Sequence, residues 1–135
     1  MTFQLTEPIL LIGLGGVGAR LAEKAKKSLN SDCLLISHDK KDLTIENSIK
    51  ISTKSVVNPS THLIRGSTLE TSDEIKKNIA NYSTIILMSN LAGKAGAGIG
   101  PIVSRICKQE QKNLLSFVVC HLSLKRKEYS SQVLH

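Results

Sequence analysis

The sequence predicts an α/β fold, a three-layer, Rossmann-like and mainly parallel sheet with helices on both faces. Short, continuous apolar runs at 8–12, 33–37 and 84–88 have the length and composition of strands that are buried on both faces. Amphipathic stretches separate these runs, so strands and helices alternate along the chain. Glycine-rich segments follow the first and third runs, where such folds turn from a strand into a helix.

The first unit of this fold is a strand, a helix and a second strand. Pro8–Ile12 is the predicted first strand, and residues 17–29 place apolar side chains at helical spacing with Glu and Lys opposite them. Asn30-Ser31-Asp32 ends the helix, and Cys33–Ser37 is the predicted second strand. A βαβ unit of about 30 residues requires parallel strands joined by a right-handed crossover.

The middle of the chain has weaker patterns. Residues 40–68 are polar, β-branched and weakly periodic, so we expect loops with room for one short strand or helix. Thr68 or Thr71 is expected to cap a helix that runs to Ala80. The apolar run Thr84–Met88 then predicts a third strand.

A second glycine-rich segment, Ser89–Pro101, follows this third strand. We expect a loop that ends at Pro101, which suits the first turn of the next helix. Leu114–His121 is the predicted fourth strand. The expected nucleotide-binding domain therefore covers residues 1–124, and residues 125–135 form a polar tail or the start of a further helix.

The charge of the chain is positive and mostly spread out. Eighteen Lys and Arg against eleven Asp and Glu give +7 at pH 7, and only Lys125–Lys127 is a compact run. This pattern favours a solvated surface with an anionic ligand over a nucleic-acid partner. An aromatic content of 3% without Trp also argues against surfaces that stack bases.

The cysteines and the apolar runs indicate the environment of the protein. Cys33, Cys107 and Cys120 lie in apolar runs without metal-type spacing, so we expect buried, reduced thiols and no metal site. No apolar run approaches the roughly 20 residues that span a bilayer. A cytoplasmic protein without a membrane span is therefore expected.

The first glycine-rich segment, Gly13–Gly18, has the pattern of a phosphate-binding turn. Gly15 and Gly16 would let the backbone approach a phosphate, while Gly18 would let the helix pack closely on the strand. The N–H groups at the helix start would then bind the anion. Asp39, about 21 residues later, stands where such folds place a carboxylate on a ribose, although a turn-capping role fits equally well.

The second glycine-rich segment and its surroundings resemble the FtsZ/tubulin family of GTP-binding filament proteins. Ala92–Pro101 is similar to the family signature Gly-Gly-Gly-Thr-Gly-Thr-Gly-Ala-Ala-Pro, and Leu11–Arg20 looks like its first phosphate loop. Ser37–Asp39 is similar to the family's Asn-Thr-Asp, and Ser72–Ile75 to its Ser-Arg-Asp-Glu-Ile-like helix. Phe117–Ser123 looks like the Val-Val-Thr-Lys-Pro-Phe strand end.

This resemblance implies GTP or GDP as the ligand, with Mg²⁺ as an accompanying ion. The residues that it places at the nucleotide are Gly15, Gly16, Val17, Gly18, Ala19, Arg20, Asp39, Gly93, Lys94, Ala95, Gly96, Ala97 and Gly98. It also implies self-association or a partner of the FtsZ/tubulin type, as in a cytoskeletal or cell-division protein.

The departures from the family pattern weaken the expectation of catalysis. Ala95 and Ala97 replace both signature threonines, and Lys94 replaces a glycine, so that its ammonium faces either a phosphate or solvent. Arg20 replaces an Asn near the base, and Lys125–Lys127 stands where the family carries a Phe-Glu-Gly-Arg-like segment. The family's Asn-x-Asp-x-x-Asp catalytic loop has no counterpart in this sequence, so we assign no catalytic residue and expect little or no hydrolysis by this chain alone.

Two alternatives remain open at this stage. Gly13–Gly18 with Asp39 also suits the NAD(P)-binding Rossmann domain of an oxidoreductase. A non-catalytic interaction module, whose glycines serve packing, is the other alternative. An uncovered sheet edge at the end of the chain would then pair with a partner or with another copy.

Overall fold

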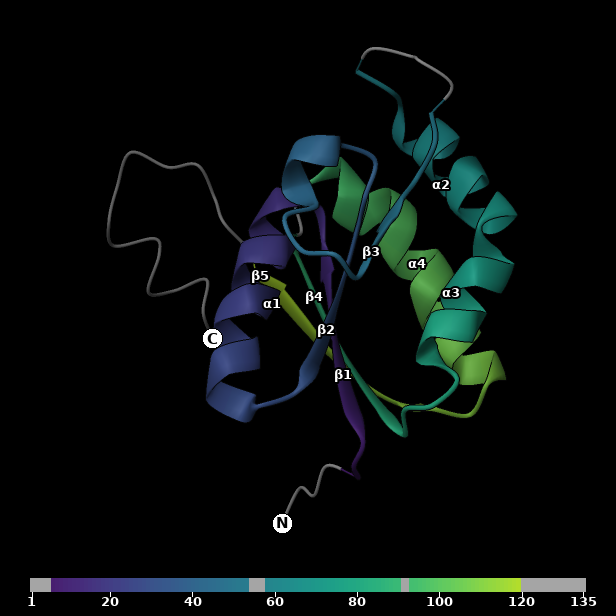
Figure 1. Cartoon of the computed structure of the whole chain (residues 1–135). Helices are drawn as coiled ribbons and strands as arrows, with labels where there is room; N and C mark the ends of the chain where they lie inside the picture. The colour runs from purple at the N-terminus through teal and green to yellow at the C-terminus, as the bar shows by residue number, and fades with distance from the viewer. Residues whose placement is uncertain (1–5, 54–57, 91–92, 120–135) are drawn as a thin grey trace.

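A computed structural model of the chain describes residues 6–53, 58–90 and 93–119 (Figure 1). These residues form a five-stranded sheet in the order β3-β2-β1-β4-β5, and all neighbouring strands are parallel. Helix α1 lies on one face of the sheet, and α2, α3 and α4 lie on the other. The predicted three-layer, parallel α/β fold is therefore confirmed.

The four predicted strands are present, and a fifth, short strand lies within 40–68. In chain order the elements are β1 (Ile9–Leu14), α1 (Gly15–Leu29), β2 (Asp32–Ser37), the 3₁₀ turn η1 (Lys40–Asp42), β3 (Ser48–Lys50), α2 (Thr61–Glu70), α3 (Ser72–Ile79), β4 (Thr84–Asn90), α4 (Lys94–Gln109) and β5 (Asn113–Val119). The predicted strand Leu114–His121 agrees with β5 as far as Val119. Its last two residues cannot be compared, since residues 120–135 lie outside the described residues.

Each face of the sheet has its own apolar core, because side chains alternate along the strands. Leu10, Ile12 and Leu14 of β1 pack with residues of α2, α3 and α4. Leu11 packs with Ala19 and Ala22 of α1 on the opposite face. The central strands are therefore buried on both sides, as their continuous apolar runs predict.

Residues 40–68, where we expected loops with room for one short strand or helix, contain more regular structure than that, namely η1, β3 and most of α2. β-Branched residues and Gly66 give this segment a weak helix propensity, so its sequence pattern is not helical. Ser60 caps α2 by accepting a hydrogen bond from the Leu63 amide at 3.1 Å, and Ile64 is fully buried in the core, where it packs against α4 at Gly98. Capping and tertiary packing stabilise the helix in place of propensity.

The predicted helix from Thr68 or Thr71 to Ala80 is divided between two elements. Thr68 lies inside α2, and α3 begins after Thr71. The Thr71 hydroxyl does not cap α3 but donates a hydrogen bond to the Ser67 carbonyl at 2.9 Å. Acidic residues in the first turn of α3, Asp73 and Glu74, stabilise its positive end instead.

Pro101 does not open a helix, as the sequence pattern suggested, but lies inside α4. A proline in a helix has no N–H, so the carbonyl four residues earlier loses its partner. That carbonyl belongs to Ala97, and it accepts a hydrogen bond from Arg65 Nη2 of α2 at 3.1 Å. A side chain from another helix thus replaces the missing bond, which sequence reasoning had no means to anticipate.

Two of the three cysteines are confirmed as buried, free thiols. Burial raises the pKa of Cys33 and of Cys107 to about 11, so both thiols are neutral at physiological pH. Cys120 lies outside the described residues. In the part of the chain that the structure describes, no helix is long and apolar enough to cross a membrane.

Candidate functional site

The strand order reverses at the carboxyl ends of β1 and β4, and we call this position the crevice, the term used for the strand reversal of a parallel α/β sheet. From β1 the chain proceeds to β2 and β3 on one side, whereas from β4 it proceeds to β5 on the other. Ligands of parallel α/β sheets bind at such a reversal of strand order. Both glycine-rich segments lie there, because one follows β1 and the other follows β4.

The two glycine-rich segments contact each other at this crevice. A Cβ atom added to Gly15 would lie only 2.8 Å from Cβ of Ala95, and Gly15 has a φ of +70°, which favours glycine. Gly15 is the first residue of α1, and Ala95 lies in the first turn of α4. The starts of two helices therefore lie side by side, each with its positive dipole end at the crevice.

Neither helix start is capped by a side chain. The N-cap residues are Leu14 for α1 and Gly93 for α4, and neither has a side-chain oxygen that could accept a hydrogen bond. By contrast, Ser60 caps α2. The side chains of these N-cap residues therefore make no hydrogen bond to the first-turn amides of α1 and α4, and amides at a helix start are ready donors for an anion.

Several glycines in these segments are required by packing. A Cβ on Gly18 would lie 2.4 Å from the carbonyl oxygen of Met88 in β4, which confirms the predicted close approach of helix and strand. A Cβ on Gly96 would lie 2.5 Å from the Asn90 carbonyl oxygen, and one on Gly98 would lie 2.8 Å from Ile64 Cγ2. These glycines are explained without any ligand.

The loop that was expected over Ser89–Pro101 is shorter in the structure, because α4 already begins at Lys94. Residues 94–100 belong to the first two turns of α4 and not to a loop. Gly96 and Gly98 weaken the helical pattern in the sequence, but the Asn90 backbone beside Gly96 and the Ile64 side chain beside Gly98 leave room only for small residues. The first segment is similarly compact, because β1 continues to Leu14 and α1 begins at Gly15.

Lys94 is exposed, and its side chain is also held by hydrogen bonds. Its ammonium donates hydrogen bonds to Asn58 Oδ1 at 2.6 Å and to the Pro59 carbonyl at 2.9 Å. The side chain thus ties the start of α4 to the residues that precede α2. Its charge still lies at the same end of the sheet as the crevice.

Asp39 has the capping role that was the alternative to ribose binding. Its Oδ1 accepts a hydrogen bond from the Lys41 amide at 3.0 Å and caps η1. This bond leaves the second carboxylate oxygen, Oδ2, at an exposed position after β2.

Sequence reasoning missed Asp42, which lies directly over the first glycine-rich segment. Its Oδ1 would be 2.9 Å from a Cβ on Gly16, and its Oδ2 accepts a hydrogen bond from Ser37 Oγ at 2.7 Å. Arg20 Nη1 lies 3.8 Å from the same Cβ position. The η1 turn brings Asp42 to this place, and no local motif marks it in the sequence.

The remaining predicted residues differ in accessibility. Ala19 is buried in the core under α1 and Ala95 is 7% exposed, so their side chains add little to a ligand surface. Val17 and Gly93 are partly exposed, while Ala97 and Arg20 are exposed. A ligand at the crevice would therefore meet mainly backbone amides, Arg20 and the Ala97 methyl group.

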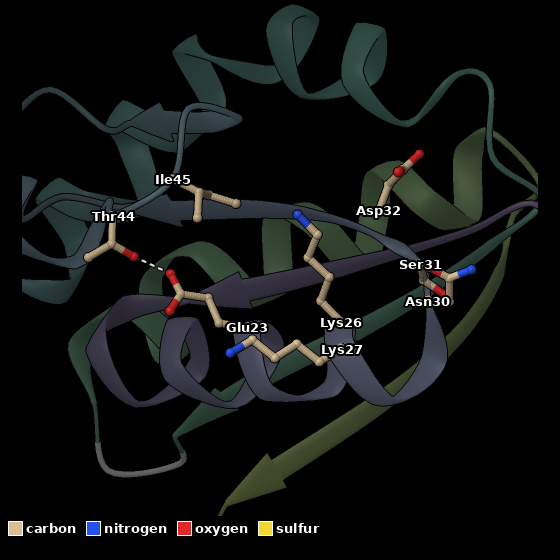
Figure 2. A pocket seen from close by; sticks show the side chains of 8 residues that line it. All are labelled: Glu23, Lys26, Lys27, Asn30, Ser31, Asp32, Thr44 and Ile45. Atoms are coloured by element: carbon tan, nitrogen blue, oxygen red, sulfur yellow. Dashed lines mark hydrogen bonds between the residues drawn. The ribbon is translucent and has the colours of Figure 1, made fainter.

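A cavity of about 600 Å³ lies at the other end of α1 (Figure 2). Lysine and carboxylate side chains both line it, namely Lys26, Lys27, Glu23 and Asp32. The carboxylates already have partners, since Glu23 accepts a hydrogen bond from Thr44 and Asp32 accepts one from Tyr82. The cavity is distant from the glycine-rich segments, and its mixed charges select no ligand class.

Tyr82 provides a test of the structure at this end of the sheet. Its hydroxyl donates a 2.6 Å hydrogen bond to Asp32 Oδ2, and this bond raises the pKa of Tyr82 to about 12. Because folding raises the pKa of Tyr82, its hydrogen bond stabilises the native state fully at pH values below the pKa of tyrosine in the unfolded chain, which is near 10. This stabilisation is lost as the pH rises toward 12.

Tyr82→Phe is therefore expected to lower the free energy of unfolding at pH 8 by about 1 kcal/mol, allowing for solvent exposure. Urea unfolding from pH 8 to 11.5 should show the difference between Tyr82→Phe and the wild type shrinking above pH 10. A difference that grows with pH would contradict the assigned hydrogen bond.

Residues 6–53, 58–90 and 93–119 contain no group of three or more His, Cys, Asp or Glu side chains that could hold a metal ion.

The fold and the crevice together define a doubly wound α/β domain with two helix starts at the strand reversal. No protein-family profile matches the sequence, and no curated protein matches it. Solved structures do match the fold. An FtsZ dimer from M. jannaschii has a TM-score of 0.77 and 20% identity, with 96% of this chain and 43% of that chain covered.

Two TubZ structures from phages are also similar. TubZ of Clostridium botulinum phage c-st has a TM-score of 0.69 and 17% identity over 90% of this chain and 42% of that one. The TubZ protofilament of bacteriophage PhiKZ has a TM-score of 0.63 and 20% identity over 93% and 42%. The chain thus has an FtsZ/tubulin-like fold, and it spans about two fifths of the length of these structures.

Proposed function

We propose that the chain binds a purine nucleotide, GTP or GDP, in the crevice between the starts of α1 and α4. The observation that carries this proposal is the contact of Gly15 with Ala95, which places two uncapped helix starts side by side at the strand reversal. The phosphates would accept hydrogen bonds from the first-turn amides of both helices. The positive helix ends stabilise negative charge at the same position.

The ligand would be held mainly by the backbone. Alanine at 95 and 97 supplies no hydroxyl, so the amides of residues 15–18 and 94–96 would be the donors. Arg20 and Lys94 add positive charge at this end of the sheet, while Asp42 opposes it beside Gly16. We therefore expect weaker binding than a threonine-containing segment would give, with Mg²⁺ reducing the repulsion between the phosphates and Asp42.

Hydrolysis by this chain alone is expected to be slow or absent. The Asn-x-Asp-x-x-Asp segment that the resemblance associates with hydrolysis does not occur in the sequence. The proposed role is a binding or regulatory one in the cytoplasm. Similar structures include an FtsZ dimer and a TubZ protofilament, so association with further copies or with an FtsZ/tubulin-like filament in a cytoskeletal or cell-division process is part of the proposal.

Equilibrium binding of GTP, GDP, ATP and NAD⁺ tests the proposal directly. We expect saturable binding of GTP and GDP, and a stabilisation of about 2.7 kcal/mol at a ligand concentration of 100 Kd. If NAD⁺ stabilises the fold and GTP does not, the domain is of the dinucleotide-binding type. If no nucleotide binds at millimolar concentration, the ligand assignment is wrong.

A further inference from the structure

The positive end of α1 is supported by none of its own side chains. Helix α1 has no side-chain cap and no acidic residue in its first turn. By contrast, Ser60 caps α2, and α3 carries Asp73 and Glu74 in its first turn. Negative charge at a helix N-terminus is stabilising. A carboxylate that the fold brings to the start of α1 from another element would therefore stabilise this helix.

The 3₁₀ turn η1 brings such a carboxylate to α1. Oδ1 of Asp42 would lie 2.9 Å from a Cβ atom on Gly16, the second residue of α1, and it is the nearest atom outside the helix to that position. The φ of Gly16 is not positive, so the backbone conformation does not require glycine here. The missing side chain at position 16 instead leaves room for the Asp42 carboxylate.

Hydrogen bonds hold Asp42 in this place. Its Oδ2 accepts a hydrogen bond from Ser37 Oγ at 2.7 Å, and Ser37 Oγ in turn accepts one from the Asp39 amide at 3.1 Å. The Asp42 amide donates to the Asp39 carbonyl at 3.0 Å. Ser37 is fully buried at the end of β2, so the carboxylate is anchored to the sheet. Its other oxygen, Oδ1, is the one that lies beside α1.

The surroundings of Asp42 Oδ1 are those that a phosphate would need. Arg20 Nη1 lies 3.8 Å from the same Cβ position on Gly16, so a guanidinium group and a helix start flank the carboxylate. Guanidinium groups and helix N-termini are common partners of phosphate in proteins. Asp42 is only partly buried, so an anion from solvent can reach this place when the carboxylate moves aside.

We propose that Asp42 is an internal competitor of the ligand phosphate at the start of α1, an inference that rests on the proposed nucleotide site. A phosphate that binds the first-turn amides of α1 must displace the carboxylate, and with it the η1 turn that carries Asp42. Helix α4 has no acidic residue in its first turn. Asp42 is thus a specificity-determining residue, which directs the phosphates to α4 first and lowers the affinity for ligands that place negative charge at α1.

Asp42→Asn tests the contact in the absence of any nucleotide. The amide oxygen of asparagine can still accept the hydrogen bond from Ser37 Oγ, but the negative charge beside α1 is lost. We expect the equilibrium constant of unfolding to rise about two- to fivefold, because a helix N-terminus loses a stabilising charge. Urea unfolding measures this constant. An unchanged or smaller constant would mean that the carboxylate does not stabilise the start of α1, and the proposal would be overturned.

Titration calorimetry with GDP, in EDTA and with Mg²⁺, tests the competition itself. In EDTA we expect Asp42→Asn to bind GDP about fivefold more tightly than the wild type, or better, because the ligand no longer has to displace a carboxylate. This advantage should shrink as NaCl or Mg²⁺ screens the charge. Glu46→Gln is the matched control, because it removes the same charge from an exposed position, where Glu46 lines a groove with Asp32 and Tyr82. Its affinity for GDP should stay within about twofold of the wild type.

The outcomes distinguish failure of this inference from failure of the nucleotide site. If Asp42→Asn binds GDP as the wild type does, or more weakly, the role of Asp42 is overturned and the nucleotide site stands. Equal tightening by Asp42→Asn and Glu46→Gln would indicate an effect of net charge, which also overturns the role of Asp42. If none of the proteins binds GDP in either buffer, the nucleotide site fails, and the competition at α1 fails with it. Circular dichroism verifies that both variants are folded.

Discussion

Replacing Gly18 with alanine is expected to destabilise the protein by about 3 kcal/mol or more. The added Cβ would lie 2.4 Å from the Met88 carbonyl oxygen and 3.2 Å from its carbon. Both atoms belong to the backbone of the interior strand β4, so helix α1 must move away from the sheet. Overpacking of a core costs about 1–3 kcal/mol and occasionally more, and we expect the upper end here because no flexible side chain can yield. Urea unfolding measures the loss.

The matched control is the same substitution at Gly66. A Cβ there meets nothing within 4 Å, and Gly66 is exposed in the middle of α2. Gly66→Ala is expected to stabilise the protein by about 0.5–1 kcal/mol, because alanine loses less backbone entropy in a helix. If both variants changed stability in the same direction, the close packing of α1 on β4 would be refuted.

Ala97→Asp is expected to weaken nucleotide binding at least tenfold without destabilising the free protein. Ala97 is exposed in the first turn of α4, at the crevice. A carboxylate there repels a phosphate, yet it interacts favourably with the positive helix end and stabilises the unliganded chain by about 0.3–1 kcal/mol. Calorimetry measures the affinity, and thermal unfolding without ligand measures the stability.

The control for charge is Gln109→Glu at the last residue of α4. It adds the same charge about 18 Å away along the helix. We expect nucleotide affinity within twofold of the wild type, together with a small loss of stability, because a negative charge is unfavourable at a helix C-terminus. Equal weakening by both variants would indicate a general charge effect, and the phosphate would not lie at the start of α4.

The helices and strands that the sequence predicted correctly share one property, a strong local pattern. The apolar runs that form β1, β2 and β4 and the amphipathic pattern of α1 are visible because burial on both faces, or on one helical face, restricts the residue types. Helix α2 was missed because its stability comes from the Ser60 cap and from the burial of Ile64. Neither contribution produces a periodic signal.

The candidate site was predictable as a pair of glycine-rich segments, but its side chains were not. Lys94 donates hydrogen bonds to Asn58 and Pro59, and Asp39 accepts one from Lys41 and caps η1, and none of these partners belongs to the glycine-rich motifs. Asp42 reaches Gly16 only through the η1 turn. Arg65 supplies the hydrogen bond that Pro101 removes from α4, so the glycine-rich segment continues as helix.

By itself the sequence determined that this chain alternates buried strands with helices and that two glycine-rich turns follow two of the strands. Those features depend on local composition and spacing, which a single chain displays directly. Only the tertiary structure decided that the two helix starts touch at Gly15 and Ala95, that Gly96 packs against the Asn90 backbone, and that Phe117 and Val118 of β5 are exposed. These properties arise from contacts between residues far apart in the chain, and strand order sets them.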